Sequence, residues 1–307
     1  MMRAAPIAYA LNAMASPIID IHPHIISPDI ARYPITPLGG KRSKWSEERP
    51  CDFSGLVAEM DAAGIDKAAI VHSSTTYGYN AAYVADSIEG RRDRFAGVFA
   101  IDVREPDAAA QIRHWVGRGM SGLRLFAAGS TVKADQSWIA APSTYPAWAC
   151  CEELDLPVAL SIRQEALAHL IDIMDRYPGV RIVIDHLLLS PIADGPPYKE
   201  SAGLFGLAKF PQVFLKLTTN NIRRAWDGLA TPETFFGQLV DAFGSARIGW
   251  GSNFPNEAGT LKEQLAEAKT ALAFLPQADR DNIFGGAAMR LYPSLADAPL
   301  KRAGGAG

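Results

Sequence analysis

The sequence predicts a single (β/α)8 barrel. Eight short apolar runs alternate with helical stretches, as expected for a parallel sheet covered on both faces. The chain has 307 residues, which is enough for one such barrel, and no segment has the composition of a linker between domains. An open doubly wound sheet is disfavoured because the turn after the first run lacks the glycine-rich dinucleotide fingerprint.

The first apolar run, Pro17–Ile19, leads directly into Asp20-Ile21-His22-Pro23-His24. A helix is expected next, and Gly64 ends it, as glycine commonly does at a helix C-terminus. The remaining seven strands are expected at 67–72, 95–101, 122–126, 157–162, 180–186, 213–217 and 247–251. The helices between strands are expected at 53–63, 79–90, 106–118, 142–154, 164–177, 199–209 and 232–243.

The barrel is expected to occupy residues 17–296. Residues 1–16 resemble a frayed extension more than a secretion signal, because their apolar run is short and interrupted by Asn12. Residues 297–307, which end in Gly-Gly-Ala-Gly, are expected to be disordered. The long polar loop 25–50 follows the first strand, and we expect it to cover the barrel mouth.

The composition excludes several classes of partner. Hydrophobic residues make up 48% and charged residues 21%, and the formal net charge is −3, so nothing favours nucleic acid or an anionic membrane surface. No stretch approaches the roughly 20 apolar residues of a membrane span. The three cysteines, Cys51, Cys150 and Cys151, form no metal-binding pattern and favour reduced thiols in the cytoplasm. The sequence leaves the oligomeric state open, and a homo-oligomer is compatible with it.

The active site of a barrel lies where its strands end and the following loops begin. Four of the six histidines fall at such ends, whereas His114 and His169 lie within helices, where a solvated or satisfied role is the default. The polar residues at the expected strand ends are His22, His24, His72, Asp102, Arg124, Arg163, Gln164, Asp185, His186, Lys216, Thr218, Ser252 and Asn253. This distribution predicts a polar site at the mouth.

The kinds of group present predict the chemistry. Neutral imidazoles can hold one divalent metal, most suitably zinc, with an open position for water, and the candidate ligands are His22, His24 and His186. Guanidinium groups bind carboxylates in a bidentate manner, and the candidate substrate contacts are Arg124, Arg163 and Arg223, with Tyr77 beside them. The plainer alternatives are satisfied core histidines and rim salt bridges, and for Arg223 a salt bridge is an equal expectation.

Several motifs spread along the chain occur in one known family. They are Asp20-Ile-His-Pro-His24, Pro28–Pro34, Gly122-Leu-Arg-Leu-Phe126, Asp185-His186, Trp250-Gly-Ser-Asn-Phe-Pro255 and Ile283–Tyr292. In these motifs the chain resembles the amidohydrolase superfamily, in the branch of pyrone dicarboxylate lactonases, fuconolactonases and sulfomuconolactone hydrolases. The resemblance implies a hydrolase that opens the lactone of a small carboxylated acid, as in the catabolism of aromatic compounds. It makes His22 and His24 the first-strand pair and Arg124 a carboxylate ligand.

The chain departs from this family at Asn253, where aspartate is usual. An amide can ligate a metal but cannot accept a proton at neutral pH. The chain is then a variant with another base, an inactivated enzyme, or a barrel that binds small acids without turnover. The candidate base is a metal-bound hydroxide or His72, while His186 or the metal would stabilise the oxyanion. Arg163 and Gln164 stand where many relatives place a metal-bridging lysine, which argues against two metals.

Two further alternatives remain from the resemblance. Some lactonases of this branch work without a metal, and their histidines then polarise the carbonyl directly. Metal-dependent, non-oxidative decarboxylation of an aromatic or enoic acid also occurs in the superfamily and needs a similar site. Released carbon dioxide, without consumption of water, would distinguish decarboxylation from hydrolysis.

Overall fold

The computed structural model describes residues 16–129, 131–132 and 135–296. The predicted N-terminal extension, apart from its last residue, and the predicted tail 297–307 lie outside the described residues. Within the described part of the chain, no helix combines the length and the apolar character needed to cross a membrane.

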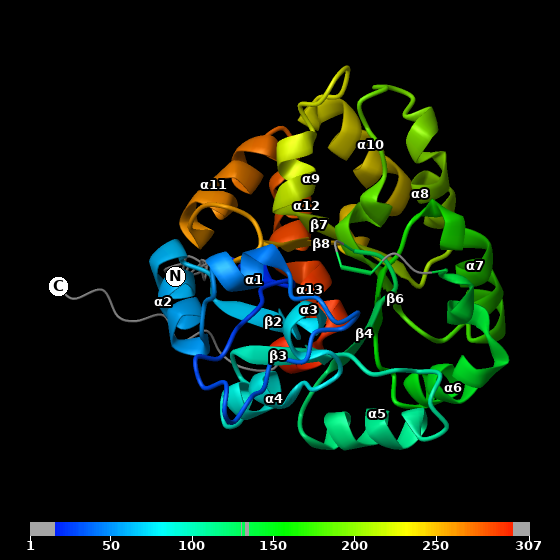
Figure 1. Ribbon diagram of the computed structural model, residues 1–307. Coiled ribbons are helices and arrows are strands. Elements are labelled where there is room, and N and C mark those ends of the chain that lie inside the picture. Colours follow the sequence, from blue (N-terminus) through cyan, green and yellow to red (C-terminus); the bar gives the residue numbers. More distant parts are fainter. Residues whose placement is uncertain (1–15, 130, 133–134, 297–307) are drawn as a thin grey trace, which may run out of the picture.

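Eight parallel strands form one sheet in the order of the sequence (Figure 1). They are β1 Ile19–Asp20, β2 Lys67–Val71, β3 Phe95–Phe99, β4 Gly122–Phe126, β5 Val158–Ser161, β6 Ile182–Ile184, β7 Val213–Thr218 and β8 Ile248–Gly251. The sheet closes where Ile21 N–H donates to the Trp250 carbonyl (3.2 Å) and Ser252 N–H donates to Oδ1 of Asp20 (2.8 Å). The predicted (β/α)8 barrel is confirmed.

Helices surround the sheet on its outer face. They are α2 Phe53–Ala63, α4 Ala82–Ile88, α5 Ala108–Gly117, α6 Tyr145–Glu153, α7 Leu167–Arg176, α8 Ala202–Gly206, α9 Thr219–Arg224, α10 Pro232–Phe243 and α11 Leu261–Ala271. The bounds of α2 and α10 are those predicted, because both ends carry local signals: Asp52 caps α2 and Gly64 ends it with φ 71°. The helix expected at 199–209 instead breaks into three short pieces, which are α8 and one 3-10 turn on each side of it.

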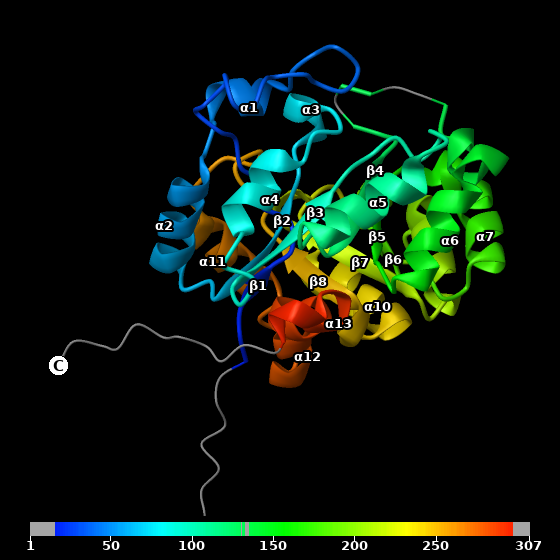
Figure 2. The ribbon, with the colours of Figure 1, turned by 90° about the horizontal axis from the view of Figure 1, so that it is seen from below.

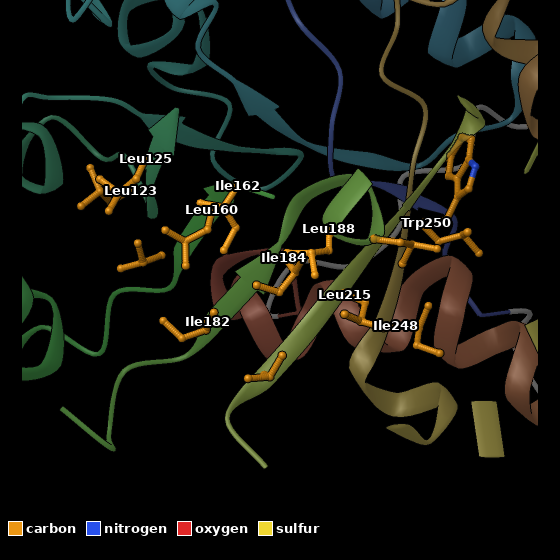
Figure 3. Close-up of a cluster of buried hydrophobic side chains, with 14 of the residues drawn as sticks. Leu123, Leu125, Leu160, Ile162, Ile182, Ile184, Leu188, Leu215, Ile248 and Trp250 are labelled. Atoms are coloured by element: carbon orange, nitrogen blue, oxygen red, sulfur yellow. The ribbon is translucent and has the colours of Figure 1, made fainter. Parts of the chain in front are cut away.

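The side chains of each strand alternate between two apolar layers. Ile182 and Ile184 of β6 belong to the large layer between the strands and the outer helices (Figure 3), whereas Val183 belongs to the smaller inner cluster. Alternation with period two then turns Asp185 toward the inside as well. The same rule separates Leu215, in the outer layer, from its neighbour Lys216. Inward polar side chains are thus placed by the strands themselves.

The two ends of the barrel differ (Figure 2). Helices α12 Gln277–Asp281 and α13 Ala287–Leu291 lie at one end, and Lys67 Nζ donates there to the Leu295 carbonyl (2.6 Å). The other end carries residues 25–50 and the short α3 Ser74–Tyr77, as predicted for the loop that covers the mouth. This loop contains α1 Lys44–Glu48, and Arg49 ties it to the opposite side by donating to the Pro255 and Asn256 carbonyls (3.2 and 2.6 Å).

Candidate active site

A cavity of about 370 Å³ opens at the carboxyl ends of the strands. Its volume suits a single small-molecule ligand. Trp45 of the covering loop forms part of its wall and stacks on His24, with ring centroids 5.3 Å apart and planes inclined by 28°. The polar side chains that line it are His24, Ser73, Ser74, Thr75, Arg124, Ser161, Arg163, His186, Asn220, Asn253, Asn256 and Glu257.

The end of β1 delivers His22 to the floor of the site. Asp20 anchors this segment, since its Oδ1 accepts the backbone N–H groups of His22 (3.0 Å) and Ser252 (2.8 Å). Burial raises the pKa of Asp20 to about 6. Gly251 permits the close approach of β8, because a Cβ there would lie 2.6 Å from the His22 Cβ. His22 is fully buried, and neither ring nitrogen has a hydrogen-bond partner among the described residues.

His24 lies two residues further along and faces the cavity. Its Nδ1 lies 2.7 Å from the Val71 carbonyl. A carbonyl can only accept, so Nδ1 carries the hydrogen and Nε2 carries the lone pair. Burial, with a smaller contribution from Arg124, lowers the pKa of His24 to about 3. At neutral pH the residue therefore offers an unprotonated nitrogen.

A buried ion cluster joins three strands beneath the cavity. Asp185 accepts from Nε of Arg124 (2.8 Å) and lies 3.1 Å from Nζ of Lys216. Burial alone would raise the pKa of Asp185, but the two cations hold it well below its usual range. Burial also lowers the pKa of Lys216. The described part of the chain offers no hydrogen-bond partner to the two terminal nitrogens of Arg124, which lines the cavity.

His186 follows β6 in an unusual backbone conformation. Four successive residues, His186 to Leu189, have φ between 51° and 63°. The left-handed conformation costs about 1–2 kcal/mol for each residue with a side chain, so surrounding contacts have to maintain it. Burial lowers the pKa of His186 to about 4, although the neighbouring Asp185 opposes this shift. The imidazole is therefore neutral at pH 7.

Three of these groups form a candidate metal site. One ligand atom each from His22, Asp185 and His186 lie within 4.8 Å of one another. Imidazole and carboxylate ligands suit zinc, and the unpartnered ring nitrogens of buried His22 are consistent with a cation. His24 lies outside this group, with its ring centroid 5.0 Å from that of His22, so its role as a ligand stays a prediction.

Asn253 lines the cavity as predicted from its position after β8. Its backbone is left-handed (φ 60°), which asparagine tolerates better than most residues. Its Nδ2 donates to Oε1 of Glu257 (3.2 Å). Glu257 also lines the cavity and lies 3.8 Å from the Arg223 guanidinium. A carboxylate therefore accompanies the amide that occupies the usual aspartate position.

Of the remaining predicted site residues, one lines the cavity and three do not. Arg163 is exposed and lines the cavity. Arg223 does not line it but binds Glu267 through two hydrogen bonds (2.8 and 3.0 Å), which is the salt-bridge alternative. Tyr77 lies outside the lining as well, and its buried hydroxyl accepts from Ser27 N–H (2.7 Å). His72 is also outside, with Nε2 bound to the Gly78 carbonyl (2.9 Å), and burial lowers its pKa to about 4.

Sequence reasoning did not assign roles to Lys216 and Glu257. Lys216 was recognisable only as a polar residue near a strand end, and its partner Asp185 is distant in the sequence. Glu257 follows Asn253 by four residues, and this spacing was the available signal. Neither residue type by itself distinguishes a buried functional group from a solvated one.

Comparison with known proteins agrees with this architecture. A curated relative, L-fucono-1,5-lactonase of Burkholderia ambifaria, is 28% identical over 257 residues, covering 79% of this chain and 84% of the relative. An amidohydrolase of Burkholderia multivorans with bound zinc superposes with a TM-score of 0.72 at 21% identity, covering 91% and 99% of the two chains.

Two further solved structures share the fold. A putative 2-pyrone-4,6-dicarboxylic acid hydrolase of Pseudomonas putida has a TM-score of 0.73 at 17% identity, covering 92% of this chain and 98% of that one. A 2,6-dihydroxybenzoate decarboxylase from Rhizobium has a TM-score of 0.63 at 18% identity, covering 91% and 99%. The amidohydrolase family model matches residues 19–294, which include every strand of the barrel. The chain belongs to the amidohydrolase family.

Proposed function

We propose that the protein hydrolyses the ester bond of a small carboxylated lactone in the cavity at the barrel mouth. The observation that carries the proposal is Arg124, which lines this cavity. Its terminal nitrogens have no hydrogen-bond partner among the described residues, while its Nε donates to Asp185. Neutral imidazoles of His24 and His186 line the same space. The lactonase relative at 28% identity supports hydrolysis of a lactone.

Arg124 and Arg163 bind the substrate carboxylate in this proposal. Arg124 lies in β4 and Arg163 follows the adjacent strand β5, and both line the cavity. Arg163 is exposed and can contact the incoming substrate from solvent, whereas Arg124 is buried and fixed by the Asp185 carboxylate. A fixed guanidinium binds a carboxylate without reorganising, which orients the ring carbonyl for attack.

Glu257 accepts the proton of the attacking water. Asn253 cannot take this role, because an amide does not accept a proton at neutral pH. Glu257 is the carboxylate among the described cavity-lining residues, and Asn253 Nδ2 donates to it at 3.2 Å. Oδ1 of Asn253, which has no hydrogen-bond partner among the described residues, then orients the water by accepting a hydrogen bond from it.

We also propose that His22, Asp185 and His186 hold one divalent cation, most suitably zinc. When bound, such a cation lowers the pKa of water and polarises a carbonyl. Elemental analysis of the purified protein, with and without chelator treatment, tests this assignment. If the purified protein contains no metal and its activity is unchanged by chelator, the histidines would instead contact the substrate directly.

The function is tested with a panel of carboxylated lactones, following proton release with and without added zinc. Arg163→Met should raise KM about tenfold or more with a smaller effect on kcat, because it removes a binding contact. The control is Arg224→Met, since Arg224 pairs with Asp227 and lies outside the cavity lining. Absence of proton release across the panel would contradict the proposal, and release of carbon dioxide would identify a decarboxylase instead.

The role of Glu257 is tested by Glu257→Gln, which keeps the shape but removes the base. General-base catalysis contributes about 10²–10⁴-fold, so kcat should fall by that factor. Glu267→Gln is the matched control, because Glu267 also binds Arg223 but does not line the cavity. Equal losses in both variants would place the effect in Arg223 instead. In Asn253→Asp, a large gain of turnover would show that the amide at this position limits catalysis.

A further inference from the structure

Two residues outside the cavity lining contact His186, one at its ring and the other at its backbone carbonyl. Thr218 Oγ1 lies 3.0 Å from Nδ1 of His186, and Asn221 Nδ2 donates to the His186 backbone carbonyl at 3.0 Å. Asn221 also binds Thr218, since its Oδ1 accepts from Thr218 N–H (3.0 Å) and lies 2.8 Å from Thr218 Oγ1. Thr218 is the last residue of β7 and the N-cap of α9 Thr219–Arg224, and Asn221 lies in the first turn of that helix.

The orientation of the Asn221 amide follows from its backbone partners. The Thr218 N–H can only donate, so the atom that faces it has to be Oδ1. The His186 carbonyl can only accept, so the atom that faces it has to be Nδ2. A flipped amide would place a donor against a donor and an acceptor against an acceptor. The amide therefore has one allowed orientation.

This orientation determines where the single hydrogen of the Thr218 hydroxyl points. Asn221 Oδ1 has no hydrogen, so the contact of 2.8 Å requires that Thr218 Oγ1 donates to it. Thr218 Oγ1 can then only accept from His186, and Nδ1 of His186 has to carry a hydrogen. We propose that Thr218 and Asn221 are positioning residues that hold His186 in the Nδ1–H tautomer, with the lone pair on Nε2.

The proposal changes the role expected for His186. A neutral ring with hydrogen on Nδ1 cannot donate a hydrogen bond from Nε2, so it does not stabilise an oxyanion. It instead presents an acceptor, which can bind a cation or receive a hydrogen bond from water or a substrate hydroxyl. Asn221 further holds the first residue of the left-handed turn through its carbonyl, so tautomer and backbone conformation depend on the same side chain.

Nitrogen-15 NMR of histidine-labelled, chelator-treated protein reads the tautomer without any assay of activity. The His186 signals are identified by their loss in His186→Gln. Wild-type protein should show a protonated Nδ1 and an unprotonated Nε2 for His186 at pH 7.5. In Thr218→Val both tautomers should appear, whereas Thr218→Ser should keep one. A wild-type spectrum with hydrogen on Nε2 would overturn the proposal, whether or not the variants fold.

The activity of the same variants gives a second readout, which rests on the proposed lactone hydrolysis. Loss of a group that orients a site histidine typically costs about 10–100-fold, and we expect this loss in kcat/KM for Thr218→Val, with rescue by Thr218→Ser. The control is Thr219→Val, because the buried Thr219 hydroxyl binds Gln264 rather than His186. Equal losses in both valine variants would contradict the positioning role. If no lactone is turned over, the NMR result still decides the tautomer.

Discussion

Substitution of Lys216 tests the buried ion cluster that this residue forms with Asp185 and Arg124 beneath the cavity. Lys216 and Asp185 are both fully buried and lie 3.1 Å apart. Removing one partner of a buried pair typically costs about 3–5 kcal/mol, because the remaining charge is left without compensation. Arg124 still donates to Asp185 at 2.8 Å, so we expect Lys216→Met to lose about 3 kcal/mol, the lower end of this range. The methionine fills most of the vacated volume, which limits any cavity contribution.

The measurement is urea unfolding at pH 7.5, in which a changed midpoint at constant slope reports stability. Lys262→Met is the matched control, since Lys262 is exposed on α11 and should change stability by less than about 0.5 kcal/mol. Adding Asp185→Asn to Lys216→Met should not recover the loss, because buried Arg124 would then lose the carboxylate to which its Nε donates. A loss in Lys216→Met no larger than in the control would refute this reasoning.

Three further predictions concern other parts of the site. Burial lowers the pKa of His72 to about 4, so between about pH 6.5 and pH 4 the unfolded chain binds a proton that the folded chain does not. As the pH falls through this range, the free energy of unfolding should decrease by roughly 1 kcal/mol per pH unit because of this histidine. Thermal melts of His72→Asn should show a correspondingly shallower decline. Gly251→Ala should reduce activity at least about tenfold through the clash with His22 Cβ, whereas Gly117→Ala, with nothing within 4 Å, should leave kcat/KM unchanged. Trp45→Ala should raise KM by about tenfold in substrate titrations, and an unchanged KM would exclude the indole as a binding surface.

Local signals account for the parts of the fold that could be predicted. The barrel order, the helix from Phe53 to Ala63 and the His22–His24 pair follow from patterns within a few residues: apolar period, caps and chain direction. The continuous helix expected at 199–209 is absent because Gly203 and Gly206 weaken the helical propensity of this segment, so tertiary packing divided it.

Pairings between distant residues account for what only the tertiary structure decided. In the sequence, Arg124 and Arg223 were both candidates for binding a carboxylate. In the structure, Arg124 binds Asp185 and lines the cavity, whereas Arg223 binds Glu267 and lies outside the lining. The tautomer of His186 likewise depends on Thr218, which is 32 residues away. A side chain's charge and hydrogen-bonding capacity are fixed by its chemistry, whereas its partner is fixed only when the barrel closes and brings remote strand ends together.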